Sequence, residues 1–178
     1  MSARERDHQS RNARLQSSEI IRPAAGYYHD RRCPGCDDRF EYRNLKFGRD
    51  PVEIETGEIV LSFTLTNTGE RTGTEVPQLY IRDRVASVVR PVKELRAFGR
   101  VTLDPGQTAE VTFRVPVDML NFTGPSGQRI VEPGVFDLQV GASSADIRLQ
   151  TQVTVTGQTR VLGREWRMES SCDIKQKE

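Results

Sequence analysis

Long apolar runs are missing from this 178-residue sequence, and cysteine, histidine and tryptophan are scarce. No stretch of 18 or more apolar residues occurs, which excludes a transmembrane helix. The first residues lack the apolar core of a secretory signal, so we expect a cytoplasmic protein with no membrane partner. The three cysteines are an odd number and lie near the two ends, which argues against a disulfide framework. Stability must therefore come from a hydrophobic core.

A strong net charge is also missing, because 26 basic and 25 acidic residues nearly cancel. Residues 40–157 contain 13 bases and 15 acids, which provides no basic surface for nucleic acid. The remaining charge lies at the ends: residues 1–39 hold eight Arg and six acids with little apolar periodicity, and residues 158–178 hold five bases and four acids around a single Trp166. We therefore predict an N-terminal tail over 1–39, one folded domain over 40–157 and a C-terminal tail over 158–178.

The central region consists of short segments in which apolar and polar residues alternate. The clearest segment is 59–66, where every second side chain is large and apolar. Similar segments predict strands at 40–47, 75–83, 98–103, 109–117, 136–140 and 147–155. Pro77 has no backbone N–H to donate, so strand 75–83 is expected at a sheet edge or bulged near its start. About seven strands separated by Gly, Pro and Asn turns predict an all-β antiparallel sandwich of the immunoglobulin or fibronectin type III-like kind.

Six motifs follow one another in this region: TNTG, EVPQLYIRD, RPVKELRAF, LDPGQ, EPG and GASSADIR. In combination they closely resemble the fibronectin type III-like module at the C-terminal end of family-3 glycoside hydrolases, the β-glucosidases and β-xylosidases. The likeness covers residues 40–157, about two-thirds of the sequence. Before Phe40 the family's approach to the module, similar to PFGxGLSYT, is replaced by RRCPGCDDR. This departure suggests a truncated, rearranged or split gene product.

A charged segment forms the candidate docking loop, with Arg90, Pro91, Lys93, Glu94, Leu95 and Arg96. The resemblance implies that the module packs beside catalytic domains, that this loop crosses the sandwich, and that Phe98 anchors the strand after it. From residue chemistry, Pro91 stiffens the start of the loop. Val92, Leu95 and Phe98 are expected to point inward, while the charged side chains stay in solvent. Two interpretations remain open: a solvated loop held by its own apolar residues, and a docking surface for a catalytic domain.

No catalytic residue is expected in this chain. The resemblance implies a retaining mechanism whose Asp nucleophile belongs to a barrel domain and whose acid/base residue belongs to a following α/β domain, and the likeness covers neither domain. The acidic residues of the central region lie at turns or strand ends: Asp83, Glu94, Asp104, Glu132 and Asp146. Nothing in the sequence pairs two of them in a cleft. We therefore predict no cofactor, and as partner the catalytic domain of a family-3-type glycosidase, including one supplied in trans.

The motif Cys33-Pro-Gly-Cys36 offers a different chemistry. Two thiolates at this spacing can bind one zinc ion, but a closed site needs four ligands, and only His29 and the distant Cys172 remain to complete it. A thioredoxin-like redox motif would require a βαβ setting, which the pattern does not predict. Three functions thus stay under consideration: an accessory glycosidase module, an independent protein- or carbohydrate-binding module, and a small zinc or redox protein.

Overall fold

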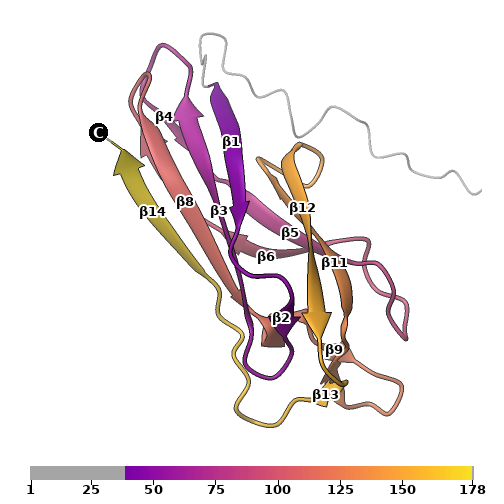
Figure 1. The fold of residues 1–178 in the computed structure, drawn as a ribbon. Coiled ribbons are helices and arrows are strands. Elements are labelled where there is room, and N and C mark those ends of the chain that lie inside the picture. Colours follow the sequence, from indigo (N-terminus) through magenta and orange to yellow (C-terminus); the bar gives the residue numbers. More distant parts are fainter. Residues whose placement is uncertain (1–38, 178) are drawn as a thin grey trace, which may run out of the picture. The chain divides into compact units, whose positions relative to one another are not determined.

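The computed structural model describes residues 39–177, which form two packed β-sheets (Figure 1). The four-stranded sheet has the order β1 (Phe40–Phe47), β3 (Glu58–Asn67), β8 (Thr108–Pro116) and β14 (Ser171–Lys177). The five-stranded sheet has the order β2 (Val52–Glu53), β12 (Ile147–Thr156), β11 (Gly134–Gly141), β5 (Gln78–Asp83) and β6 (Glu94–Phe98). The predicted all-β antiparallel sandwich is confirmed, with one short parallel pair between β2 and β12.

Shorter elements close the ends of the sandwich. A small sheet has the order β13 (Arg160–Val161), β10 (Arg129–Val131) and β9 (Phe122–Thr123), and β4 (Gly73–Glu75) pairs with β7 (Val101–Leu103). A 3-10 turn, η1 (Val117–Leu120), follows β8. Over residues 39–177 the structure has no helix of the length and apolarity that crossing a bilayer requires.

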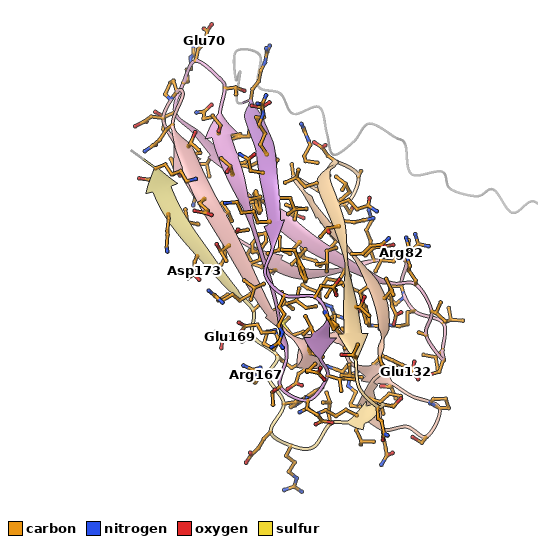
Figure 2. The ribbon with its side chains drawn as sticks, viewed as in Figure 1. Glu70, Arg82, Glu132, Arg167, Glu169 and Asp173 are labelled. Atoms are coloured by element: carbon orange, nitrogen blue, oxygen red, sulfur yellow. The ribbon has the colours of Figure 1, made fainter. Side chains whose placement is uncertain are left out.

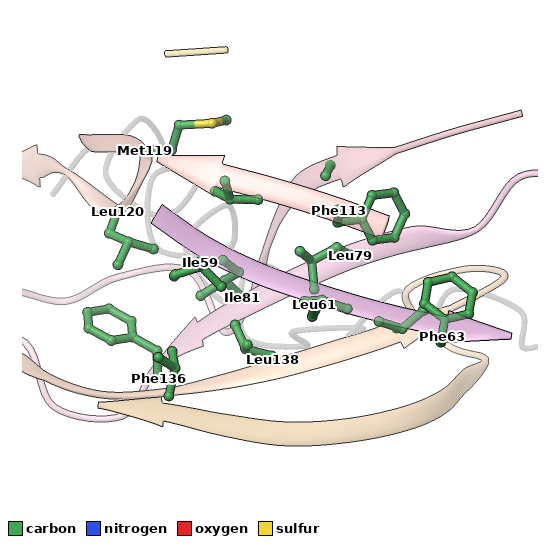
Figure 3. Close-up of a cluster of buried hydrophobic side chains, with 14 of the residues drawn as sticks. Ile59, Leu61, Phe63, Leu79, Ile81, Phe113, Met119, Leu120, Phe136 and Leu138 are labelled. Carbon is green, nitrogen blue, oxygen red and sulfur yellow. The ribbon is translucent and has the colours of Figure 1, made fainter. Parts of the chain in front are cut away.

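The hydrophobic core lies between the two sheets, as the alternating sequence pattern predicts. In the four-stranded sheet, β3 pairs with β8 so that Leu61 lies opposite Phe113 and Phe63 lies opposite Val111. Their side chains meet those of the five-stranded sheet, and the large buried members include Ile59, Leu61, Phe63, Leu79, Phe113, Phe136 and Leu138 (Figure 3). Burial of two apolar sheet faces against each other is the main source of stability for this fold.

Two segments predicted as single strands are each divided between two sheets. The segment 75–83 is interrupted at Pro77, so that β4 pairs with β7 while β5 lies between β11 and β6. The expected bulge is present between Leu79 and Tyr80, but β5 is not an edge strand. The segment 98–103 is interrupted at Gly99, where the chain passes from β6 to β7. Alternation alone does not show such a crossing, because both halves keep the same pattern.

The structure corrects the sequence-based prediction of a C-terminal tail over 158–178. Residues 160–161 form β13, and residues 171–177 form β14, which pairs with β8 in a continuous antiparallel register. Only Cys172 and Ile174 in β14 are apolar, so the strand lacks the alternation by which the others were recognised. Gly99 allows its close approach, since a Cβ atom there would lie 2.3 Å from Cys172 Sγ. Backbone pairing at the β8 edge, rather than apolar burial, holds β14 in the sheet.

Asp118 in η1 attaches the C-terminal segment to the rest of the domain. Its carboxylate is buried and accepts a hydrogen bond from Arg160 Nη1 at 2.6 Å and from the Arg167 backbone N–H at 2.8 Å. Arg160 Nη1 also donates to the Ile54 carbonyl oxygen at 3.2 Å. The Trp166 ring, packed against the core, lies under the Arg129 guanidinium at 5.3 Å. A buried ion pair therefore fixes the start of the segment that ends in β14.

Candidate functional site

The β5–β6 connection, residues 84–93, is the candidate functional site. It projects from the five-stranded sheet (Figure 1), and Figure 2 marks its surroundings with Arg82 on β5 and Glu132 before β11. Residues 82–92 line a shallow hollow of about 590 Å³. The segment has no regular secondary structure, so its shape depends on side-chain contacts with the sandwich.

Arg90 is the centre of these contacts. Its Nη1 donates to Asp83 Oδ2 at 2.8 Å and its Nη2 donates to Glu94 Oε2 at 2.8 Å, so one guanidinium joins both ends of the loop. The same guanidinium stacks over the Phe122 ring at 4.9 Å. Arg96 Nη2 lies 2.8 Å from the same Glu94 oxygen. The side chains of Arg90 and Asp83 are only 9% and 4% exposed, so this ion pair is buried and weakly screened by solvent.

Further polar contacts attach the loop along its length. Arg84 Nε pairs with Asp137 Oδ1 at 2.9 Å, and the Ser87 backbone N–H donates to Glu132 Oε2 at 3.0 Å. Lys93 donates to the Ser144 carbonyl oxygen and places its ammonium over the Tyr80 ring at 5.6 Å. The loop is therefore held in one conformation from both sides, and a partner would meet a surface that is already ordered.

The apolar side chains of this region point the opposite way from the sequence-based expectation. Val92, Leu95 and Phe98 were expected to point inward, but they are 74%, 46% and 65% exposed, and Phe98 anchors no strand. Val85 and Val89 are still more exposed. The expectation that Arg90 and Arg96 remain in solvent is also wrong, because both are mostly buried in ion pairs. Residue hydrophobicity could not reveal that the arginines are buried and the apolar side chains exposed, because the burial of Arg90 depends on its ion pairs with Asp83 and Glu94.

Two carboxylates, Asp83 and Glu94, come together at this loop, as a pair of acids would in a glycosidase. Both are bound by Arg90, and the nearly complete burial of Asp83 keeps its carboxylate away from a sugar. The arrangement is suited to holding the loop rather than to cleaving a glycosidic bond.

The other acids named from the sequence have separate structural partners. Asp104 Oδ1 accepts a hydrogen bond from the Thr72 hydroxyl at 2.5 Å. Glu132 receives the Ser87 N–H, and Asp146 Oδ1 pairs with Arg148 Nε at 2.6 Å. These contacts account for their positions at strand ends and turns.

The cysteine motif cannot be placed. Cys33, Cys36 and His29 lie outside the described residues, and the remaining candidate ligand, Cys172, lies in β14. Burial raises the pKa of the Cys172 thiol to about 11, so it is protonated at neutral pH. Within residues 39–177, no group of three or more His, Cys, Asp or Glu side chains could hold a metal ion.

A second group of titratable side chains lies near the start of β5, at the end away from the β5–β6 connection. Its members are Tyr42, Glu75, Asp146 and Arg148. The carboxyl of Glu75 is partly buried, and burial raises its pKa from the ordinary value of 4.5, a shift that Asp146 reinforces and Arg148 opposes. Burial and the neighbouring Glu75 raise the pKa of Tyr42, whose ring stacks on Phe63 at 5.6 Å. Sequence analysis missed this group because its members come from separate strands and turns.

Replacing Glu75 with glutamine is expected to raise the thermal midpoint at pH 7. A carboxyl whose pKa is higher in the folded state costs stability once it ionises, so the wild-type protein loses stability as the pH rises from 4.5 through the folded pKa. Glutamine keeps the acceptor for the Val76 N–H but carries no charge. The gain should disappear near pH 4, and differential scanning calorimetry at several pH values measures it. The exposed Glu70 provides the control, since Glu70→Gln should show no such pH-dependent gain.

The family model of the fibronectin type III-like domain matches residues 75–144, which run from β4 to the turn after β11. Among curated relatives, a putative β-xylosidase of Formosa agariphila is 38% identical over 109 residues, covering 61% of this chain and 14% of the relative. A periplasmic β-glucosidase of Salmonella typhimurium is 37% identical over 98 residues, covering 55% of this chain and 13% of the relative. This chain therefore spans only about a seventh of the length of these relatives.

Solved structures of β-glucosidases also match this chain over a small part of their own length. A β-glucosidase involved in saponin metabolism from intestinal bacteria matches 67% of this chain and 16% of its own, with 39% identity and a TM-score of 0.62. β-Glucosidase 3B from Thermotoga neapolitana matches 70% of this chain and 16% of its own, with 33% identity and a TM-score of 0.61. The likeness to family-3 glycoside hydrolases inferred from the six motifs is confirmed, and it concerns the fibronectin type III-like part of those enzymes.

Proposed function

We propose that this chain, which carries a fibronectin type III-like domain similar to that of family-3 β-glucosidases and β-xylosidases, is a non-catalytic accessory module in carbohydrate metabolism. Its partner is the catalytic domain of a family-3-type glycosidase, either in the same chain, as in the relatives, or supplied in trans as a split enzyme. Its role is to dock to that domain and stabilise it.

The single observation that carries this proposal is the exposure of apolar side chains on the β5–β6 connection and on β6. Ten large apolar side chains are exposed among the described residues, and five of them fall between positions 85 and 98: Val85, Val89, Val92, Leu95 and Phe98. Apolar side chains gathered on one exposed segment mark an interaction site. We name these five residues the docking surface. Burying them against a partner would recover about 25 cal/mol for each Å² of apolar area removed from water.

The ion pairs below the docking surface support the same role. A flexible loop would lose conformational entropy on binding, whereas the contacts of Arg90, Arg84 and Lys93 fix the loop in advance. Arg90 also binds the two carboxylates that come together there, Asp83 and Glu94. A module built in this way contributes a surface and leaves the bond cleavage to its partner.

Binding to a catalytic fragment tests the proposal. The full chain should bind the catalytic domains of Thermotoga neapolitana β-glucosidase 3B prepared without their own C-terminal module, as measured by isothermal titration calorimetry. The double variant V89D/V92D should weaken binding by at least about tenfold, because two charges would be desolvated in an apolar contact. The variant Val161→Asp is the matched control, since Val161 is exposed on β13 outside the docking surface, and should bind normally.

Three outcomes would contradict the proposal. Equal binding by V89D/V92D and the wild-type chain would exclude the docking surface. Binding to a polysaccharide in place of the catalytic fragment would favour an independent carbohydrate-binding module. Turnover of an aryl β-glucoside by the purified chain, lost on replacing one of its own acids, would refute a non-catalytic role.

A further inference from the structure

The outer edge of β14 is open. β14 is the last strand of the four-stranded sheet, and only its β8 side is paired among the described residues (Figure 1). An unpaired strand edge presents N–H and C=O groups that can bind another extended segment. Proteins usually protect such edges with proline, a bulge, a very short strand or charged side chains, above all lysine. β14 runs for seven residues in unbroken register without proline, so its protection rests on Lys175 and Lys177.

The charges on β14 complement those of a second β14. In an antiparallel pair centred on Ile174, Asp173 of each copy lies opposite Lys175 of the other, and Ser171 lies opposite Lys177. Moving the centre to Lys175 places two lysines opposite each other, although Asp173 then lies opposite Lys177, and moving it to Asp173 places two acids opposite each other. Only the pairing about Ile174 forms opposite-charge pairs without a like-charge pair. Opposite charges directly across two strands stabilise the pair and like charges destabilise it. The strand thus favours one register with a copy of itself, in which the protective lysines lose their effect.

The side chains needed for this pairing are available. Asp173 is 57% exposed, and its contact with the half-exposed Arg114 at 3.4 Å is of a kind that contributes little. Lys175 is exposed, and Lys177 reaches Glu110 only at 4.0 Å. Ile174 lies on the core side of β14, opposite Val111, yet remains 38% exposed because the strand extends past the edge of the sandwich. Pairing about Ile174 would bring the two exposed isoleucine side chains together.

We propose that two copies of this chain associate through antiparallel pairing of their β14 strands about Ile174, so that their four-stranded sheets become one continuous sheet. The interface consists mainly of backbone hydrogen bonds and two symmetry-related Asp173–Lys175 pairs, so association is weak and depends on concentration and salt. The docking surface belongs to the five-stranded sheet, and its residues Leu95 and Phe98 lie on β6, which neighbours β14 at Gly99. The two proposals are tested by changes at different residues, so one can fail while the other holds.

Sedimentation equilibrium of the full chain over a wide concentration range tests this pairing. The wild-type chain should show a monomer–dimer equilibrium that shifts toward monomer at high salt. Lys175→Asp places two acids opposite each other and should raise the dimer dissociation constant by at least about tenfold. The double variant D173K/K175D restores the opposite charges with their positions exchanged and should recover the dimer. Recovery of the dimer would show that Lys175→Asp acts through the charges across the interface and not through damage to β14.

A matched control makes the same charge change at the other edge of the same sheet. Lys46 is exposed on β1, and Lys46→Asp should leave the equilibrium unchanged. A chain that stays monomeric at every concentration would overturn the proposal. So would a dimer that Lys175→Asp does not weaken, which would indicate exchange of β14 between copies.

Discussion

Replacing Arg90 with alanine is expected to lower the free energy of unfolding by about 3–5 kcal/mol. The substitution leaves the buried Asp83 carboxylate without a charged partner, removes one of the two guanidinium groups that bind Glu94, and deletes the cation stacked on Phe122. An uncompensated buried charge is among the most destabilising results of a single substitution. Urea unfolding followed by circular dichroism measures the change.

Two further variants identify the cause. Arg82 is exposed on the same strand as Asp83, so Arg82→Ala should change stability by no more than about 0.5 kcal/mol. The double variant R90A/D83N should recover part of the loss, because the unpaired charge disappears together with its partner. If R90A is as stable as the wild type, the loop is not held by the buried ion pair, and the preorganised docking surface loses its basis.

Replacing Asp118 with alanine should have the second largest effect, about 2–4 kcal/mol. It leaves the Arg160 guanidinium without its buried acceptor at 2.6 Å and frees the Arg167 N–H. Because Asp118 fixes the start of the C-terminal segment, the amide protons of β14 should exchange with solvent much faster, while those of β3 should change less. Hydrogen exchange followed by mass spectrometry distinguishes the two strands.

Glu169 provides the matched control for Asp118. It is an exposed acid in the same C-terminal segment, labelled in Figure 2, and Glu169→Ala should leave both stability and exchange unchanged. Equal acceleration of exchange in β3 and β14 of the Asp118→Ala variant would mean that the whole domain opens at once. In that case Asp118 would not be a local attachment point for the C-terminal segment.

Most of the sandwich could be predicted because each long strand has its own local alternation of apolar and polar residues. The strand at 40–47 was predicted with the bounds of β1, and the alternating segments at 59–66, 109–117 and 147–155 correspond to β3, β8 and β12 within one or two residues. In each, an apolar face must be buried, and a period of two is sufficient to reveal it. The short strands β2, β9, β10 and β13 span two or three residues, too few for a period to show.

The loop marked by the motif RPVKELRAF stays a prediction as a docking site, and the structure corrects how its side chains are arranged. The segment contains Arg90 and three residues of the proposed docking surface. The direction of its side chains was reversed, because residue chemistry places valine inside and arginine outside unless something else compensates. The compensation comes from Asp83 and Phe122, and Phe122 belongs to β9, well beyond the loop in the sequence.

The sequence by itself determined the class of fold, the position of its main strands and its likeness to the glycosidase module, because these depend on local alternation and on motifs in a fixed order. Only the tertiary structure decided that the C-terminal residues form an edge strand and that Arg90 is buried while Val89 is exposed. Those outcomes depend on contacts that only the folded chain makes: β14 pairs with the distant strand β8, and the Arg90 guanidinium joins Asp83 to Glu94 while it stacks on Phe122. The alternation of apolar and polar residues records none of these contacts.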